Sequence, residues 1–139
     1  MIESKAKGCY VYFQPNEKDI SDRYGDCTIR SLCKVLNLTW LETFDLLLPF
    51  MRESQCMIFG ATLDLYKKWF SQLGFEYHGI SNKKGSKRIN IKEFSKTHPQ
   101  GSYIARVANH FVAVVDGKYY DTFDSGFMSM YGFYEFKSN

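Results

Sequence analysis

Apolar residues recur at helical spacing through much of the first half of the chain and at strand spacing near its end. Apolar side chains three or four positions apart predict helices over residues 27–37 and 62–73, and one from Thr39 that Pro49 limits or kinks. Runs rich in aromatic and β-branched residues predict strands over residues 9–13, 75–80, 102–107, 110–115, 118–123 and 131–137. Because most helices precede most strands, the order predicts an α+β fold with an antiparallel sheet.

Local signals place several element boundaries. Capping boxes, in which Thr or Asn is followed three residues later by Glu, mark helix starts at Thr39 and Asn90. Gly74 is typical of the position just after a helix. Residues 51–60 have no clear period and are expected to form a loop, and residues 81–88 a solvated basic loop. No aromatic residue is interleaved with the basic residues of that loop, which disfavours a nucleic-acid site there.

The composition indicates one domain over residues 1–139 with a real core, because 45% of the residues are apolar and 17% are aromatic. The net charge of +3 predicts no strong attraction to nucleic acid or to a membrane surface. No signal peptide and no membrane-spanning run are recognisable, so we expect a cytoplasmic protein with reduced thiols. The cysteine spacings contain no Cys-x-x-Cys pair, and we expect no metal and no cofactor.

Cys27 is expected to open a helix. Gly25 can bend the chain and Asp26 is a typical N-cap residue, which puts Cys27 at the positive end of the helix dipole, where a thiol has a lowered pKa. On a helical wheel Cys27 lies about 160° from the centre of the apolar stripe, whereas Cys33 belongs to that stripe. The position favours a reactive thiol, and the alternative is a solvent-facing cysteine without a role. Arg30 is expected to pair with Asp26 at i, i+4.

A second polar constellation follows from a predicted hairpin. If residues 116–117, Asp-Gly, form a two-residue turn, His110 and Asp121 become diagonal neighbours on one face, and Asp124 falls on the other. Taken singly, His110 could be an ordinary strand-edge residue and Asp121 an ordinary strand-end residue. A thiol nucleophile, however, needs a base, and the base needs an orienting group. Cys27, His110 and Asp121 would supply all three.

These residues resemble the papain-like cysteine hydrolases, in which a cysteine opens a central helix and a later antiparallel sheet carries His and an acid or amide. The element of His strand, turn and Asp also resembles that of the bacteriocin leader peptidases within this group. The segment 25–32, taken with residues 110–124, is similar to small bacterial and phage proteins of this type. The resemblance spans roughly residues 13–124 and lies more in order and spacing than in any one residue. It implies a papain-like α+β fold in which N-terminal helices pack on a C-terminal antiparallel sheet.

The resemblance also implies acyl chemistry through a thioester. The Cys27 thiolate would attack a carbonyl, His110 would move the proton, and Asp121 would hold the imidazole ring. The Cys27 backbone N–H would be one oxyanion donor and a side-chain amide the other. The family usually places a Gln a few residues before the cysteine, whereas here Gln14 lies thirteen residues upstream and Asn16 is a competing amide.

Three functions follow as hypotheses. The first is a thiol hydrolase, a peptidase or amidase, acting on a peptide or protein substrate. The second is an acyltransferase that uses the same triad with an amine in place of water. The third is a catalytically silent papain-like binding module, for example a phage-encoded protein that binds a host partner, which the missing near-cysteine Gln would favour.

Overall fold

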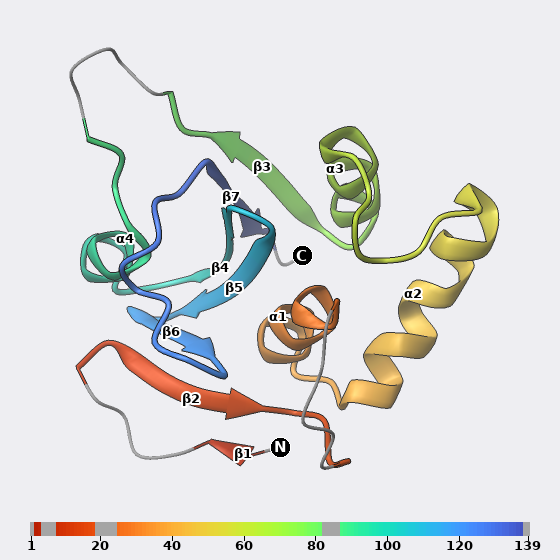
Figure 1. Ribbon diagram of the computed structural model, residues 1–139, viewed down its shortest axis with the longest axis horizontal. Coiled ribbons are helices and arrows are strands. Elements are labelled where there is room, and N and C mark those ends of the chain that lie inside the picture. Colours follow the sequence, from red (N-terminus) through yellow and green to blue (C-terminus); the bar gives the residue numbers. More distant parts are fainter. Residues whose placement is uncertain (1, 4–7, 19–24, 82–86, 138–139) are drawn as a thin grey trace.

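The computed structural model describes residues 2–3, 8–18, 25–81 and 87–137, which form seven strands and four helices (Figure 1). Within this described part of the chain, no helix combines the length and the apolar character needed to cross a bilayer. In chain order the elements are β1 (Ile2–Glu3), β2 (Tyr10–Gln14), α1 (Cys27–Leu36), α2 (Trp40–Ser54), α3 (Leu63–Gln72), β3 (Phe75–Gly79), α4 (Ile91–Thr97), β4 (Ser102–Val107), β5 (His110–Val115), β6 (Lys118–Asp121) and β7 (Gly132–Phe136).

The strands form one sheet in the order β1-β2-β6-β5-β4-β7-β3. The α+β class is confirmed, but the sheet is mixed, because β2 runs parallel to β6 and places Tyr12 opposite Asp121. The prediction of an entirely antiparallel sheet is therefore wrong at this pair. Parallel neighbours need a long crossover connection, and here the chain between β2 and β6 provides it. Such a pairing joins distant segments, and the alternation of apolar and polar residues in either strand does not reveal it.

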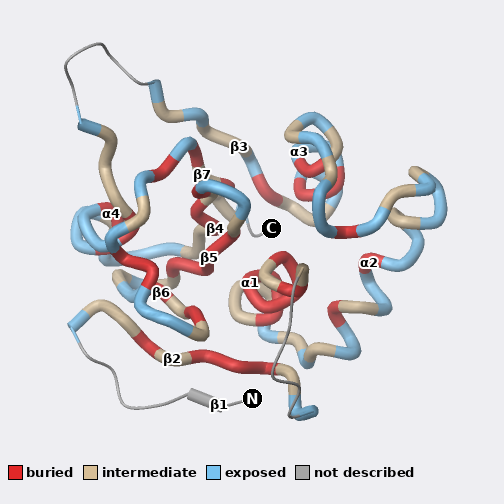
Figure 2. The backbone as a smooth tube through the Cα atoms, in the orientation of Figure 1, coloured by how far each residue is buried: buried red, intermediate tan, exposed pale blue. Residues whose placement is uncertain are grey.

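Each face of the sheet buries its own apolar core, because alternate residues of a strand point to opposite faces. Ile104, Phe111 and Tyr134 belong to the core shared with α1, α2 and α3. Ala105 and Val112 belong to the core shared with α4. Figure 1 shows these two layers of helix on either side of the central strands, and Figure 2 shows burial concentrated in α1 and those strands.

Helix α1 is the element that positions the candidate nucleophile. It begins at Cys27, ends at Leu36 and packs along β5 and the neighbouring strands. Ile29, Leu32 and Cys33 are buried in the core on this side of the sheet, so the apolar stripe expected from the sequence is confirmed. Packing of this stripe on the sheet fixes where the first turn of α1 ends up.

The capping signals are confirmed at both predicted sites. Thr39 accepts a hydrogen bond from the Glu42 backbone N–H at 3.1 Å, and Glu42 accepts one in return from the Thr39 backbone N–H at 2.9 Å. Asn90 and Glu93 form the same reciprocal pair at the start of α4. Gly74 has a φ of +96°, the left-handed conformation expected just after α3.

Two boundary predictions differ from the structure by more than one residue. Helix α2 contains Pro49 and continues to Ser54, so the loop expected over residues 51–60 is wrong for its first four positions. Pro49 lies on the exposed side of α2, where water can satisfy the carbonyl that loses its partner. Strand β6 ends at Asp121, two residues before the predicted end. Most of the loop expected over residues 81–88 lies outside the described residues.

Candidate active site

The backbone just before α1 is tightly confined. Gly25 has a φ of +84°, and a Cβ added to it would lie only 2.6 Å from the Phe59 ring. Both facts require glycine at this position, because other residues rarely adopt that conformation and would collide with the ring. The turn then delivers Cys27 as the first residue of α1, half-buried at the edge of the core. Cys27 is thus not turned out into solvent, which was the alternative considered from the sequence.

Asp26 occupies the N-cap position, but its side chain makes no capping hydrogen bond, so the predicted role of its carboxylate is wrong. The carboxylate instead forms an ion pair with Arg30, as the i, i+4 spacing predicts. Competition explains the difference, since a buried guanidinium one turn away is a stronger partner than a backbone N–H. The same guanidinium reaches Asp121, with Nη2 at 3.4 Å from Oδ1.

The hairpin of β5 and β6 brings His110 to Asp121. Asp116 and Gly117 have φ values of +49° and +80°, which match a two-residue turn with both central residues left-handed. Across this turn β5 and β6 pair in the predicted register. The two side chains meet with His110 Nε2 at 2.6 Å from Asp121 Oδ2.

Asp121 is almost completely buried and its carboxylate is held on several sides. Ser125 donates its hydroxyl to Oδ2 at 2.8 Å, and the Thr122 backbone N–H donates to Oδ1 at 2.7 Å. With Arg30 and His110 added, the carboxylate oxygens have four partners. A buried carboxylate held by that many donors cannot rotate freely, which is what the orienting group of a catalytic base requires.

The pKa values of Cys27 and His110 shift in opposite directions. Burial raises the pKa of the Cys27 thiol, but hydrogen bonding to His110 and the positive charges of His110 and Arg30 outweigh it, and the net shift is downward. Burial lowers the pKa of His110, yet hydrogen bonds to Asp121 and Cys27 raise it to about 9. Between these two pKa values the stable state is a thiolate beside an imidazolium.

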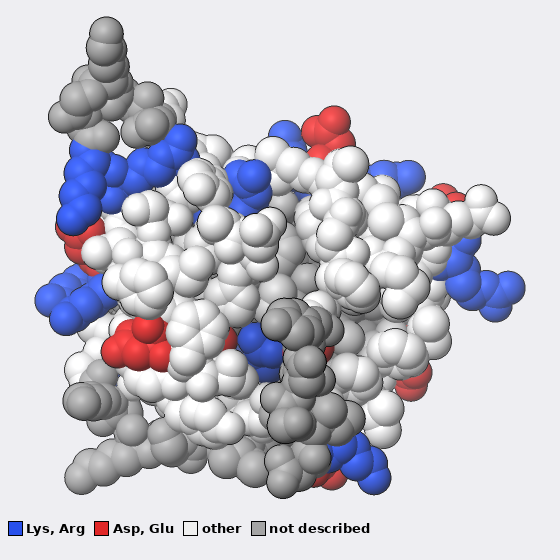
Figure 3. Space-filling view, in the orientation of Figure 1, with Lys and Arg blue, Asp and Glu red and all other residues white. Residues whose placement is uncertain are grey.

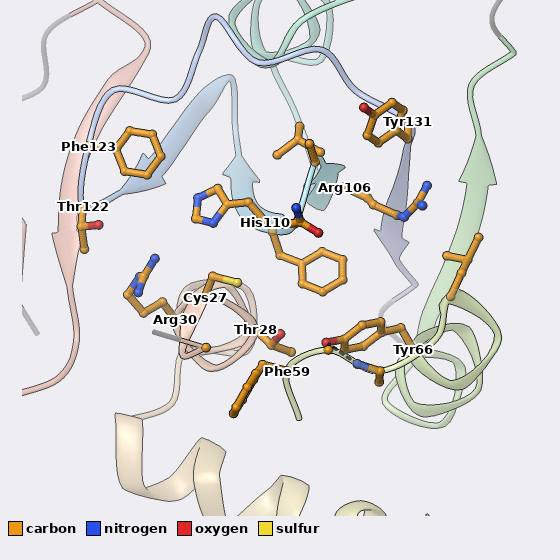
Figure 4. Close-up of a pocket in the computed structure, with 18 of the residues that line it drawn as sticks. Cys27, Thr28, Arg30, Phe59, Tyr66, Arg106, His110, Thr122, Phe123 and Tyr131 are labelled. Atoms are coloured by element: carbon orange, nitrogen blue, oxygen red, sulfur yellow. Dashed lines mark hydrogen bonds between the residues drawn. The ribbon is translucent and has the colours of Figure 1, made fainter. Parts of the chain in front are cut away.

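Cys27 and His110 lie together in a cleft of about 1250 Å³ (Figure 4). Phe123 stands on one side of His110 and stacks on its ring, with the centroids 5.4 Å apart. Arg106 and Tyr66 line the other side. The sulfur and the imidazole are thus open to a molecule entering this cleft.

The two candidate oxyanion amides lie in different places. Gln14 is buried at the end of β2 and lines the cleft. Its Oε1 accepts a hydrogen bond from the Asn16 backbone N–H at 2.9 Å, so the amide group has a fixed orientation. Asn16 is not among the residues that line the cleft, and its side chain accepts the Lys18 backbone N–H at 3.0 Å. The geometry therefore favours Gln14 over Asn16.

Asp124 does not approach His110. Its carboxylate accepts hydrogen bonds from the Tyr119 hydroxyl and from the Gly126 backbone N–H. Sequence reasoning missed two contacts with the Asp121 carboxylate. One is made by the Ser125 hydroxyl and the other by the Arg30 guanidinium. The i, i+4 spacing explained Arg30 fully on its own helix, and nothing in the sequence indicates that the loop after β6 turns back onto Asp121.

Among the described residues, one group could hold a metal ion. The ligand atoms of Glu76, His78 and Glu135 lie within 4.8 Å of one another on strands β3 and β7. Glu76 is exposed, and Glu135 already forms an ion pair with Lys137 at 3.1 Å. The group is separate from the cleft.

Comparison of the chain with protein-family models, with curated proteins and with solved structures gave no significant match.

Proposed function

We propose that this protein is a papain-like thiol hydrolase that cleaves a peptide or a related amide, with Cys27 as nucleophile. The observation that carries the proposal is the position of His110 between Cys27 and Asp121, with the opposite pKa shifts of thiol and imidazole. The packing of a cysteine-bearing helix on a sheet that carries the His and Asp supports a papain-like arrangement. All four cysteines are free, which suits a reducing compartment such as the cytoplasm.

In the first half of the reaction, the Cys27 thiolate attacks the carbonyl carbon and forms a C–S bond. The His110 imidazolium gives its proton to the leaving nitrogen as the C–N bond breaks, so the amine departs neutral. Asp121 keeps the ring oriented and stabilises its positive charge, without taking a proton itself. The product of this half is a thioester on Cys27.

In the second half, neutral His110 removes a proton from a water molecule, whose oxygen attacks the thioester carbonyl. The C–S bond breaks, the acid is released, and the thiolate–imidazolium pair is restored. An amine in place of water would make the protein an acyltransferase by the same steps. The choice between water and amine depends on access to the thioester.

We assign the oxyanion contacts to the Cys27 backbone N–H and the Gln14 side chain. The first N–H groups of a helix have no partner within it, and the one at Cys27 lies beside the nucleophile. Gln14 lines the same cleft with its Oε1 already occupied, which leaves the amide N–H₂ as the group that can donate. Together they would stabilise the negative charge on the tetrahedral intermediate.

Incubation with a peptide library in H₂¹⁸O tests this proposal. New chain ends are read by mass spectrometry, and the Cys27→Ala variant supplies the background. We expect Cys27-dependent cleavage in which each new C-terminus carries ¹⁸O from water. Acyl groups joined to added amines would indicate the acyltransferase. An absence of Cys27-dependent products from peptides and folded proteins would contradict both and favour the binding module.

A further inference from the structure

The cleft around Cys27 has an uneven charge distribution. Of the described residues that line it, two are arginines and none is Asp or Glu. Arg30 is neutralised by Asp26 and Asp121 behind the site. Arg106, by contrast, has no carboxylate within ion-pair distance among the described residues. Among the described residues, Arg106 is therefore the cation of this part of the cleft that has no ion-pair partner.

Arg106 is held in place rather than free to swing away. It lies near the end of β4 opposite Phe111, which directly follows His110 in the chain. Its Nη1 donates to the Tyr77 hydroxyl at 3.3 Å, and its guanidinium lies 5.4 Å from the centre of the Tyr131 ring. These contacts use one donor and one face of the group, so the remaining N–H groups stay available. In Figure 4 the guanidinium lies across the cleft from Phe123.

We propose that Arg106 binds a carboxylate of the substrate and so selects peptides that are acidic near the scissile bond. This inference rests on the proposed function and adds the substrate class. A preoriented guanidinium in a partly buried site binds carboxylate through paired hydrogen bonds, and a lysine would not reproduce that fork. The aromatic residues Phe59 and Tyr66, which also line the cleft, would contact apolar parts of the peptide.

The surface around the cleft is consistent with this choice. In the space-filling view, most charged groups lie toward the edges of the face, one basic side chain lies near its middle, and an acidic group lies between that side chain and the left edge (Figure 3). Because Arg106 has no carboxylate within ion-pair distance among the described residues, its charge distinguishes an acidic peptide from a neutral one. The source of the carboxylate is either an Asp or Glu side chain or a free C-terminus.

The test uses peptidyl acyloxymethyl ketones that differ only by Glu or Gln at one of three positions before the ketone. Cys27 forms a thioether with each probe as the carboxylate leaving group departs, and mass spectrometry gives the labelling rate. A second series has a central epoxide with a free or an amidated C-terminus. We expect one carboxylate probe to label at least about tenfold faster than its neutral twin. The series that shows this effect identifies the source of the carboxylate.

The Arg106→Gln variant should lose this preference, and Arg106→Lys should keep part of it. Arg88→Gln is the matched control, because Arg88 lies 4.7 Å from the same Tyr131 ring but does not line the cleft. We expect Arg88→Gln to keep the preference within about twofold, because Arg88 is half-buried outside the cleft lining.

Iodoacetamide, which carries no carboxylate, separates the two possible failures. If iodoacetamide labels Cys27 fast but the two members of every probe pair react at equal rates, the role of Arg106 is overturned and the proposed function stays intact. A preference for the carboxylate probe that survives in Arg106→Gln has the same meaning. Ordinary iodoacetamide reactivity would contradict the proposed function instead. In that case, NMR titration of the Cys27→Ala variant measures its affinity for the same Glu and Gln peptides without the electrophile. Equal affinities for the two peptides would overturn the role of Arg106.

Discussion

Helix α1 carries two cysteines, six positions apart, in opposite chemical environments. Cys27 stands at the first turn, in the cleft, where His110 and Arg30 lower its pKa. Cys33 is fully buried, contacts the Thr43 hydroxyl at 3.3 Å, and has its pKa raised to about 11 by burial. Because both thiols lie on one helix, the secondary structure alone does not make a thiol reactive.

The difference lies in what each thiol faces across the core. Burial raises the pKa of both, but only Cys27 also has positive groups close enough to overcome that effect. These positive groups belong to a chain of contacts along which negative and positive groups alternate. The chain runs from Cys27 to His110, Asp121, Arg30 and Asp26. The lowered pKa of Cys27 therefore depends on the sheet and the helix together.

The largest effect is expected from removing each of the two thiols in turn. Cys27→Ala should reduce turnover by at least about 10³-fold, because it removes the nucleophile. Cys33→Ala should keep turnover near wild type and cost about 1 kcal/mol of folding free energy from lost packing. Turnover of a library-derived substrate and urea denaturation measure the two quantities. Equal turnover in the two variants would contradict the assignment.

Asp121→Asn tests whether the environment of His110 causes the difference between the pKa values of Cys27 and Cys33. The variant keeps the size of the side chain but loses its charge, so the pKa of His110 should fall from about 9 and the ring should lose its orientation. We expect turnover to drop by about 10³-fold, a loss typical of a misoriented base. Steady-state kinetics measure the drop, and NMR titration of the imidazole gives the pKa. Asp124→Asn is the control and should leave the His110 pKa unchanged.

A smaller effect is expected from the oxyanion amide. Gln14→Ala should lower kcat by about 10²-fold, as expected for loss of one oxyanion donor, without changing the rate of iodoacetamide labelling. Asn16→Ala should have little effect on kcat, because Asn16 is not part of the cleft lining and its side chain accepts the Lys18 backbone N–H. If Asn16→Ala lowers kcat more than Gln14→Ala does, the assignment of the donor is wrong.

The smallest effect on turnover is expected at Arg30, which acts through Asp121. Arg30→Gln should raise the pKa of Cys27, since Arg30 helps to lower it, and reduce turnover by about tenfold. The loss of a buried cation beside two carboxylates should also cost about 3 kcal/mol of stability. Arg30→Lys, which keeps the charge, should keep most of the downward shift in the pKa of Cys27. Denaturation curves and the pH dependence of alkylation separate the two effects.

The parts of the structure that the sequence predicts well are those encoded within a few residues. Capping boxes at Thr39 and Asn90 mark helix starts directly, and the Asp116-Gly117 turn sets the register that brings His110 to Asp121. These signals rest on local backbone geometry, so one segment contains all the information.

The parts that the sequence did not predict depend on distant segments. The parallel pairing of β2 with β6 joins residues more than a hundred positions apart. Arg30 has a sufficient local partner in Asp26, so its second contact with Asp121 is visible only once helix and sheet are packed. The capping role expected of Asp26 fails for a local reason, because Arg30, one turn away on α1, takes up its carboxylate.

The most direct test of the thiolate–imidazolium pair is the pH dependence of Cys27 alkylation by iodoacetamide in wild type and in His110→Ala. Because the pKa of Cys27 is lowered, the midpoint of wild-type labelling should lie below that of an ordinary thiol, about 8.5. In the variant the midpoint should move up to about 8.5 or higher, the range of an ordinary thiol. Wild-type turnover, unlike alkylation, should also fall above pH 9, where His110 loses its proton. A wild-type midpoint near that of an ordinary thiol, unchanged in His110→Ala, would contradict the central claim.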